Sequence, residues 1–129
     1  MNGETKTKIL LIDDDRFLLD MYSLKFKSHG LEVDIASGSM AALDKLRGQY
    51  DVDIVLLDII MPTRDGIALL EKIREEKLIP NSVIVMLTNQ ADDQEKAKKL
   101  GVDGFIVKAM TIPSEVVAKV LEIYKQKKK

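Results

Sequence analysis

Residues 52–66 have the sequence VDIVLLDIIMPTRDG, in which a short, largely apolar run is interrupted at Asp58 and followed by turn-forming residues. The run from Val52 to Leu57 has the length of a strand, and its nearly continuous apolar character is typical of a strand covered on both faces. A carboxylate at the end of a buried strand costs free energy unless another group compensates for its burial. Asp58 is therefore the first candidate for a functional residue.

Other short apolar runs also end in polar residues. These are Asp13 and Asp14 after 9–12, Thr88 after 83–87, and Lys108 after 105–107. In a parallel sheet the carboxyl ends of all strands lie along one edge, so these side chains are expected to share a cleft with Asp58. Such a cleft would combine a carboxylate nucleophile, a pair of acids for a divalent metal ion, and two groups that hold a phosphoryl oxygen.

The order of apolar runs and amphipathic stretches predicts an α/β fold of five βα units. The expected strands are 7–12, 32–36, 53–57, 83–87 and 104–107, and the expected helices are 15–29, 38–48, 66–78, 91–100 and 113–126. Apolar and acidic residues alternate in 31–35, which places the second strand at an edge. We predict a flavodoxin-like doubly wound (βα)5 fold with a five-stranded parallel sheet in the order 2-1-3-4-5.

Helical periodicity and capping residues support these boundaries. The first helix is expected to bury Leu18, Met21, Tyr22 and Phe26, and the last to bury Val117, Val120, Leu121 and Tyr124. Ser37 is expected to cap the second helix, and Pro113 suits the first turn of the last one.

The composition predicts one domain. With 129 residues the chain is long enough for one core, and we assign 6–126 to the domain and 1–5 and 127–129 to flexible termini. A net charge of −1 lacks the positive excess that nucleic-acid binders use, so no nucleic-acid partner is expected. Apolar runs are too short to cross a membrane, cysteine is absent, and a cytoplasmic protein is the simplest interpretation.

Five segments of the chain resemble the receiver domain of two-component response regulators, in particular the single-domain, chemotaxis-regulator-like members. They are LLIDDD at 10–15, DIVLLDIIMP at 53–62, DG at 65–66, MLT at 86–88 and GVDGFIVK at 101–108. The resemblance runs from about Lys6 to about Tyr124, and the segments have the order and separations of that family.

The resemblance implies a role for each of these residues. Asp58 would be the phosphoacceptor, with Thr88 and Lys108 as partners of the phosphoryl oxygens. Mg²⁺ would be held by Asp13, Asp14, Asp58 and the backbone carbonyl of Ile60, and Thr88 and Phe105 would form the switch. These roles describe a phosphoacceptor that catalyses only its own phosphorylation and dephosphorylation, not an enzyme acting on other substrates.

The resemblance also implies partners. A histidine kinase or a histidine phosphotransfer protein would donate the phosphoryl group. The face formed by 91–100, 104–107 and 113–126 would then bind a downstream protein target, which the sequence does not identify. The chain is expected to act as a monomer or a phosphorylation-dependent dimer, away from membranes.

Three positions depart from the usual pattern of the family. Ala109 replaces the proline that usually follows the lysine, so a cis peptide bond between Lys108 and Ala109 would cost about 2.5–4 kcal/mol. Asn89 stands where a small residue is usual. Ile60 is apolar at a position whose side chain faces the phosphoryl group, and it cannot hydrogen-bond to an attacking water. We therefore expect slow hydrolysis of phosphorylated Asp58.

Two other functions fit part of the pattern. Asp13 and Asp15 have the Asp-x-Asp spacing of haloacid-dehalogenase-like phosphatases, in which Asp13 would be the nucleophile and Asp15 the acid. Against this, Phe17 stands where that family favours Thr or Val, and Asp58 has no role. We interpret Asp15 instead as the start of a helix. A pseudo-receiver that binds partners without phosphorylation is the second alternative, because Ala109 departs from the family.

Overall fold

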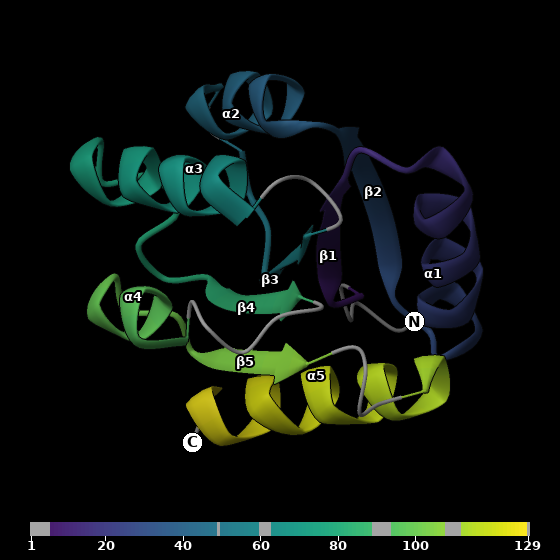
Figure 1. Cartoon of the computed structure of the whole chain (residues 1–129). Coiled ribbons are helices and arrows are strands. Elements are labelled where there is room, and N and C mark those ends of the chain that lie inside the picture. Colours follow the sequence, from purple (N-terminus) through teal and green to yellow (C-terminus); the bar gives the residue numbers. More distant parts are fainter. Residues whose placement is uncertain (1–5, 49, 60–62, 89–93, 108–111, 129) are drawn as a thin grey trace.

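The computed structural model describes residues 6–48, 50–59, 63–88, 94–107 and 112–128, and for 58, 59, 63–65 and 128 it describes the backbone alone (Figure 1). Strands and helices alternate along the chain. The strands are β1 (Lys8–Asp13), β2 (Glu32–Ser37), β3 (Ile54–Ile59), β4 (Val83–Thr88) and β5 (Gly104–Val107). The helices are α1 (Arg16–Ser28), α2 (Ser39–Arg47), α3 (Thr63–Glu75), α4 (Gln94–Lys99) and α5 (Pro113–Lys128).

The five strands form one parallel sheet in the order β2-β1-β3-β4-β5, which confirms the predicted flavodoxin-like topology. β2 lies at one edge, as the alternation of apolar and acidic residues predicts, and β5 lies at the other. Among the described residues, no helix combines the length and the apolar character that crossing a membrane requires.

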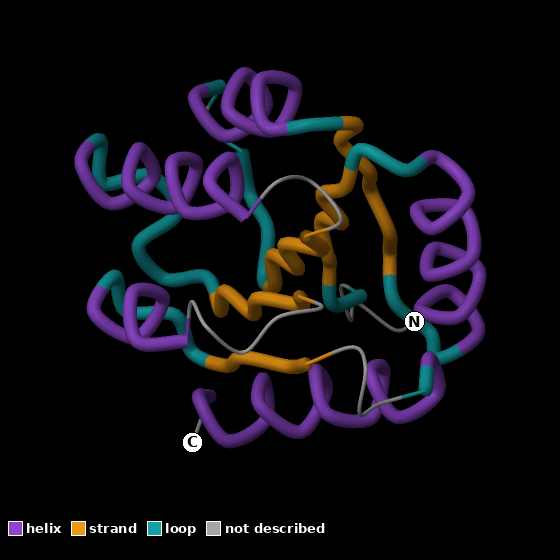
Figure 2. Tube along the Cα trace, viewed as in Figure 1, coloured by secondary structure: helices purple, strands orange, loops and turns teal. Residues whose placement is uncertain are grey.

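Helices cover both faces of the sheet (Figure 1; Figure 2), and a hydrophobic core lies beneath the helices on each face. Successive strand residues point to opposite faces, so Ile9 and Leu11 of β1 join the core under α1 and α5, while Leu10 and Ile12 join the core under α2, α3 and α4. All four side chains are 0–2% exposed. Burial on both faces explains why β1, β3 and β4 are almost continuously apolar.

The residues that α1 buries lie on a slightly different side of the helix from the residues that were predicted to be buried. Leu19, Tyr22 and Phe26 are buried, whereas Leu18 and Met21 are half-buried at the margin of the same core. Both sets have helical spacing, and packing against the sheet selects between them. In α5, Val117 and Val120 are buried as predicted, but Val116 completes the stripe, and Leu121 and Tyr124 are half-buried.

Backbone geometry explains two differences from the predicted helix ends, one at α3 and one at α2. α3 runs from Thr63 to Glu75 instead of 66–78, and it ends where Lys77 takes the left-handed conformation with φ 55°. The Lys77 and Leu78 amides then donate to carbonyls of the last turn, as in a Schellman motif. The predicted Ser37 cap is wrong, since Gly38 occupies the cap position of α2 with φ 98° and no side chain caps the helix.

The last helix is longer than predicted. α5 begins at Pro113, as expected, but continues past 126 to Lys128. Lys127 Nζ lies 3.0 Å from Oδ1 of Asp103, the residue before β5.

Candidate functional site

The parallel register brings Asp13 and Asp58 to neighbouring positions. Ile12 pairs with Leu57, and Asp13 and Asp58 are the next residues of the two strands. Thr88, the last residue of β4, pairs with the last residue of β3. Since adjacent strands are about 4.8 Å apart, the backbones of these three candidate residues lie together at the carboxyl edge of the sheet.

β1, β3 and β4 end one or two residues later than predicted. Asp13 and Thr88 are the last residues of β1 and β4, and β3 continues through Asp58 to Ile59, because both residues still pair with β4. The polar candidates therefore belong to the strands, and the sheet fixes their backbones.

The other candidate positions are only partly described. Thr88 pairs with Val107, the last residue of β5, and Lys108 is the next residue in the sequence. Lys108 lies outside the described residues, as do Ile60, Asn89 and Ala109, and the Lys108-Ala109 peptide with them. The side chain of Asp58 is likewise not described.

Asp13 is buried, and only one of its two carboxylate oxygens accepts a hydrogen bond from a described residue. Its side chain is 0% exposed, and Oδ1 accepts a hydrogen bond of 3.0 Å from the Asp15 amide. Its Oδ2 is buried and has no hydrogen-bond partner among the described residues. A buried carboxylate oxygen without a donor is costly, and a hard divalent cation is the ligand that such an oxygen suits. The residues present therefore fit the Mg²⁺ that the sequence implies.

Asp14 lies beside Asp13 but is exposed. Its Oδ1 would be 3.1 Å from a Cβ atom at Gly38, whose φ of 98° already disfavours any other residue. Gly38 is thus needed twice, for the start of α2 and for the space that the Asp14 carboxylate occupies. Asp14 is thus exposed near the start of α2, while Asp13 is buried.

Asp15 caps α1. Its Oδ1 accepts hydrogen bonds from the Phe17 amide at 2.9 Å and the Leu18 amide at 3.4 Å. The interpretation of Asp15 as a helix start is therefore confirmed. A carboxylate engaged with two amides is poorly suited to act as the acid of a dehalogenase-like phosphatase.

Thr88 and Phe105 lie on the two strands farthest from β2. Thr88 is 1% exposed. Phe105 is half-buried, pairs with Met86, and packs against the core under α2, α3 and α4. Phe105 therefore lies in the layer that α4 covers.

A polar cluster at β2 was not anticipated from the sequence. Tyr50 Oη donates to Asp34 Oδ2, Lys45 Nζ lies 3.2 Å from the same oxygen, and Lys8 Nζ lies 4.5 Å from the centre of the Tyr50 ring. Burial and the bond to Asp34 raise the pKa of Tyr50. Burial acts to raise the pKa of Asp34, but hydrogen bonds from Tyr50, the Ile35 amide and Lys45 together lower it. Only the fold brings these residues together, so no local pattern could have revealed them.

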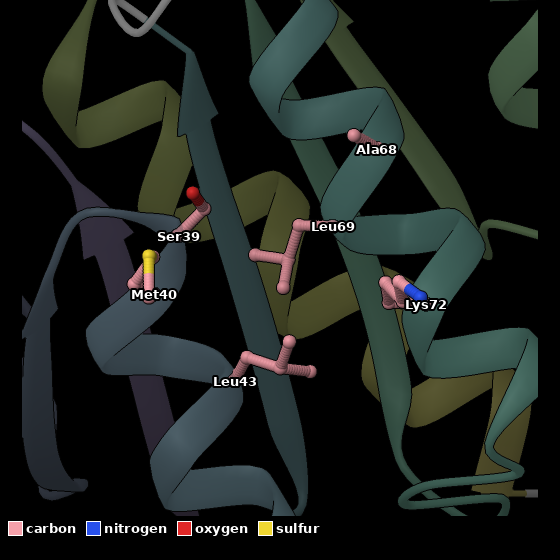
Figure 3. A pocket seen from close by; sticks show the side chains of 6 residues that line it. All are labelled: Ser39, Met40, Leu43, Ala68, Leu69 and Lys72. Atoms are coloured by element: carbon pink, nitrogen blue, oxygen red, sulfur yellow. The ribbon is translucent and has the colours of Figure 1, made fainter.

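A shallow groove lies between α2 and α3 (Figure 3). Its lining residues are Ser39, Met40, Leu43, Ala68, Leu69 and Lys72. The groove is mostly apolar and contains no carboxylate, so it is not the candidate site. Among the described side chains no group of three or more His, Cys, Asp or Glu residues is arranged as a metal site, and Asp58 is outside that set.

Comparison with known proteins identifies the family. The family model for the response regulator receiver domain matches residues 9–121. The chain belongs to the response regulator receiver domain family. As a receiver domain, it is a signalling domain of two-component systems and not a classical enzyme.

Among curated relatives, the receiver is similar to the chemotaxis protein CheY of Halobacterium salinarum, with 31% identity over 107 residues that cover 83% of this chain and 88% of that protein. It is 36% identical over 125 residues to the transcriptional regulatory protein ResD of Bacillus subtilis, covering 93% of this chain and 49% of ResD. The receiver thus spans about half the length of ResD and of other transcriptional regulators that it matches, such as a CpxR homolog of Haemophilus influenzae at 51%.

Solved structures show the same architecture. A CheY-like receiver domain protein from Methanospirillum hungatei superposes with a TM-score of 0.83 at 26% identity, covering 96% of this chain and 98% of that one. The response regulator TrrA of Thermotoga maritima, solved in complex with Mg²⁺ and BeF, superposes with a TM-score of 0.75 at 26% identity, covering 91% and 98%.

Proposed function

We propose that this receiver takes a phosphoryl group from a histidine kinase or a histidine phosphotransfer protein onto Asp58. A carboxylate oxygen of Asp58 attacks phosphorus, an acyl phosphate forms, and the bond from phosphorus to the donor histidine breaks. Asp58 is proposed for this role because its strand position lies next to Asp13 at the edge where the acids gather.

The observation that carries the proposal is the unpartnered Oδ2 of buried Asp13 among the described residues. In the proposed site Asp13, Asp14, Asp58 and the backbone carbonyl of Ile60 would hold Mg²⁺, which would offset the negative charge of the acids and of the incoming phosphoryl group. The exposed position of Asp14 leaves its carboxylate accessible to a hydrated cation.

Thr88 and Lys108 would hold the phosphoryl oxygens. Phosphorylation adds about −1.5 to −2 charges, so a hydroxyl donor and an ammonium would stabilise the product. Movement of Thr88 and Phe105 would then alter the surface formed by α4, β5 and α5, to which a downstream protein binds. We further propose that 6–126 is sufficient for this function in the cytoplasm, as a monomer or a phosphorylation-dependent dimer.

Intact mass spectrometry tests the assignment. The protein is incubated with acetyl phosphate, with Mg²⁺ or with EDTA, and one phosphoryl group is expected only with Mg²⁺. Asp58→Asn should remain unlabelled. Asp51→Asn is the matched control, because Asp51 is exposed before the start of β3, and it should be labelled like the wild type.

Two results would contradict the proposal. Labelling of Asp58→Asn that disappears in Asp13→Asn would identify Asp13 as the nucleophile and favour a phosphatase of the dehalogenase type. An unlabelled wild type, also after incubation with an active histidine kinase, would favour a pseudo-receiver that only binds partners.

A further inference from the structure

The turn between β2 and α2 is tied to β1 at the carboxyl edge of the sheet (Figure 1). Ser37, the last residue of β2, pairs with Asp13, and the Gly38 amide donates a hydrogen bond of 3.0 Å to the Asp13 carbonyl. On the other side of the turn, the Gly38 carbonyl accepts a hydrogen bond of 3.2 Å from the Ala42 amide in α2. Both backbone groups of Gly38 are therefore engaged, and the turn has little room to shift.

Glycine at position 38 forgoes a helix cap. Ser, Thr, Asp or Asn at this position could cap α2 with a side-chain oxygen, whereas Gly38 leaves α2 without a side-chain cap. The neighbouring Asp14 gives a reason for this choice. A Cβ atom at Gly38 would lie 3.1 Å from Asp14 Oδ1, which is closer than the roughly 3.3–3.6 Å of ordinary contacts between carbon and oxygen. Any side chain at this position would therefore meet the carboxylate.

The two neighbouring acids are held in different ways. Asp13 is fixed by its complete burial and by the hydrogen bond that its Oδ1 accepts from the Asp15 amide. Asp14 is exposed, and among the described residues no hydrogen bond or ion pair holds its carboxylate. The position of the Asp14 carboxylate therefore depends on the space around it, and Gly38 provides that space on one side.

We propose that Gly38 is a positioning residue for the metal site, where its missing side chain lets Asp14 place its carboxylate on Mg²⁺. This inference rests on the proposed function, in which Asp14 is a ligand of the ion. Since hydrogen bonds fix the turn on both sides of Gly38, a Cβ atom there would displace the Asp14 carboxylate by a few tenths of an ångström. Mg²⁺ requires nearly ideal octahedral geometry with oxygens at about 2.0–2.1 Å, so a displaced ligand binds it less well. Gly38 thereby sets the affinity for Mg²⁺.

A titration with Mg²⁺, followed by ¹H–¹⁵N NMR on the full chain without a phosphodonor, tests the proposal. Gly38→Ala should raise the Kd for Mg²⁺ roughly tenfold, which is the smaller end of the effect expected when a group that orients a metal ligand is changed. The matched control is Gly30→Ala. Gly30 also has a positive φ, of 85°, but a Cβ atom there would have nothing within 4 Å. Gly30→Ala should lose stability through backbone strain and keep the Kd of the wild type.

A double-mutant cycle tests whether Gly38 acts through Asp14. In EDTA, Gly38→Ala should lower the Tm of the wild type more than it lowers the Tm of Asp14→Ala, because the shortened side chain leaves space for the added Cβ atom. Equal losses of Tm in the two backgrounds would show that backbone strain alone is responsible. If Gly38→Ala unfolds, the same variants are made with Lys77→Gly, which removes a positive φ at the end of α3 and gives a more stable background.

The remaining outcomes separate this inference from the proposed function. A folded Gly38→Ala variant with the Kd of the wild type would overturn the role of Gly38 and leave phosphorylation of Asp58 intact. An equal rise of Kd in Gly30→Ala would also overturn it, since loss of stability would then explain the weaker binding. The expected difference between the two variants, in a protein that neither acetyl phosphate nor a histidine kinase phosphorylates, would support the role of Gly38 and contradict the proposed function. A wild type that binds no Mg²⁺ would contradict the metal site and this inference with it.

Discussion

Replacing Asp13 by asparagine should stabilise the protein in the absence of divalent metal. The amide side chain keeps an oxygen that can accept from the Asp15 amide, and it removes the charge whose Oδ2 is buried without a partner among the described residues. An unsatisfied buried polar group costs about 1–3 kcal/mol, and more when it is charged. The free energy of unfolding in EDTA should therefore rise by about 2 kcal/mol, offset in part by the new amide donor.

The same substitution should remove the response to Mg²⁺. For a chain of 129 residues, a gain of about 2 kcal/mol corresponds to an increase in Tm of roughly 8 °C. A ligand that binds only the native state, at a free concentration of about a hundred times its Kd, adds about 2.7 kcal/mol to the wild type. Mg²⁺ should thus raise the Tm of the wild type by a similar amount, and the Tm of Asp13→Asn much less.

Thermal unfolding followed by circular dichroism, in EDTA and in Mg²⁺, measures both effects. Asp51→Asn serves as the control, because it removes one exposed acid and should change neither the Tm in EDTA nor the Mg²⁺ response. A lower Tm for Asp13→Asn in EDTA would show that the Asp13 carboxylate is satisfied in the native protein. Equal Mg²⁺ shifts in Asp13→Asn and the wild type would place the cation elsewhere.

Three further predictions concern stability. Lys77→Gly should raise the free energy of unfolding by about 1 kcal/mol in urea titrations, because Lys77 occupies the left-handed conformation that glycine adopts without strain. Gly104→Ala should lower it by about 1–3 kcal/mol, since a Cβ atom would overlap Ile123, and Gly104→Ala combined with Ile123→Val should recover part of the loss. Because the pKa of Asp34 is lowered in the folded protein, the charged Asp34 stabilises the fold at pH values above the usual pKa of 3.8. This stability is lost as the pH falls through the lowered pKa. Tyr50→Phe should therefore be less stable than the wild type at pH 7, by about 1 kcal/mol in urea titrations, with a smaller difference near pH 3.

Much of the fold was predictable because burial on both faces leaves a clear pattern. The apolar runs of β1, β3 and β4 and the alternating residues of β2 identify central and edge strands. The choice between Leu18 and Leu19 as the buried residue of α1 was not predictable, since both fit helical spacing. Packing against the neighbouring strand and helix decides it. The end of α3 at Lys77 was missed for a related reason, because lysine carries no signal for a left-handed conformation.

The place of the candidate residues at the edge of the sheet was predictable, but the burial and the hydrogen bonds of the side chains were less so. Polar residues at the ends of apolar runs indicated the carboxyl edge, and the register brings the backbones of Asp13 and Asp58 together there. Asp13 is buried and Asp14 is exposed, and Gly38 lies beside Asp14 although the two residues are far apart in the sequence. The hydrogen bond between Tyr50 and Asp34 also depends on the tertiary fold.

The polar cluster at β2 has a further consequence for the behaviour of the chain at high concentration. An edge strand exposes unpaired amides and carbonyls, to which a strand of another molecule can add. A strand that added to β2 would lie beside the charged side chains of Glu32 and Asp34. Hydrogen bonds from Tyr50 and Lys45 fix the position of the Asp34 carboxylate. At the opposite edge, β5 has only four residues and offers little length for pairing. Both edges of the sheet are thereby protected against aggregation through added strands.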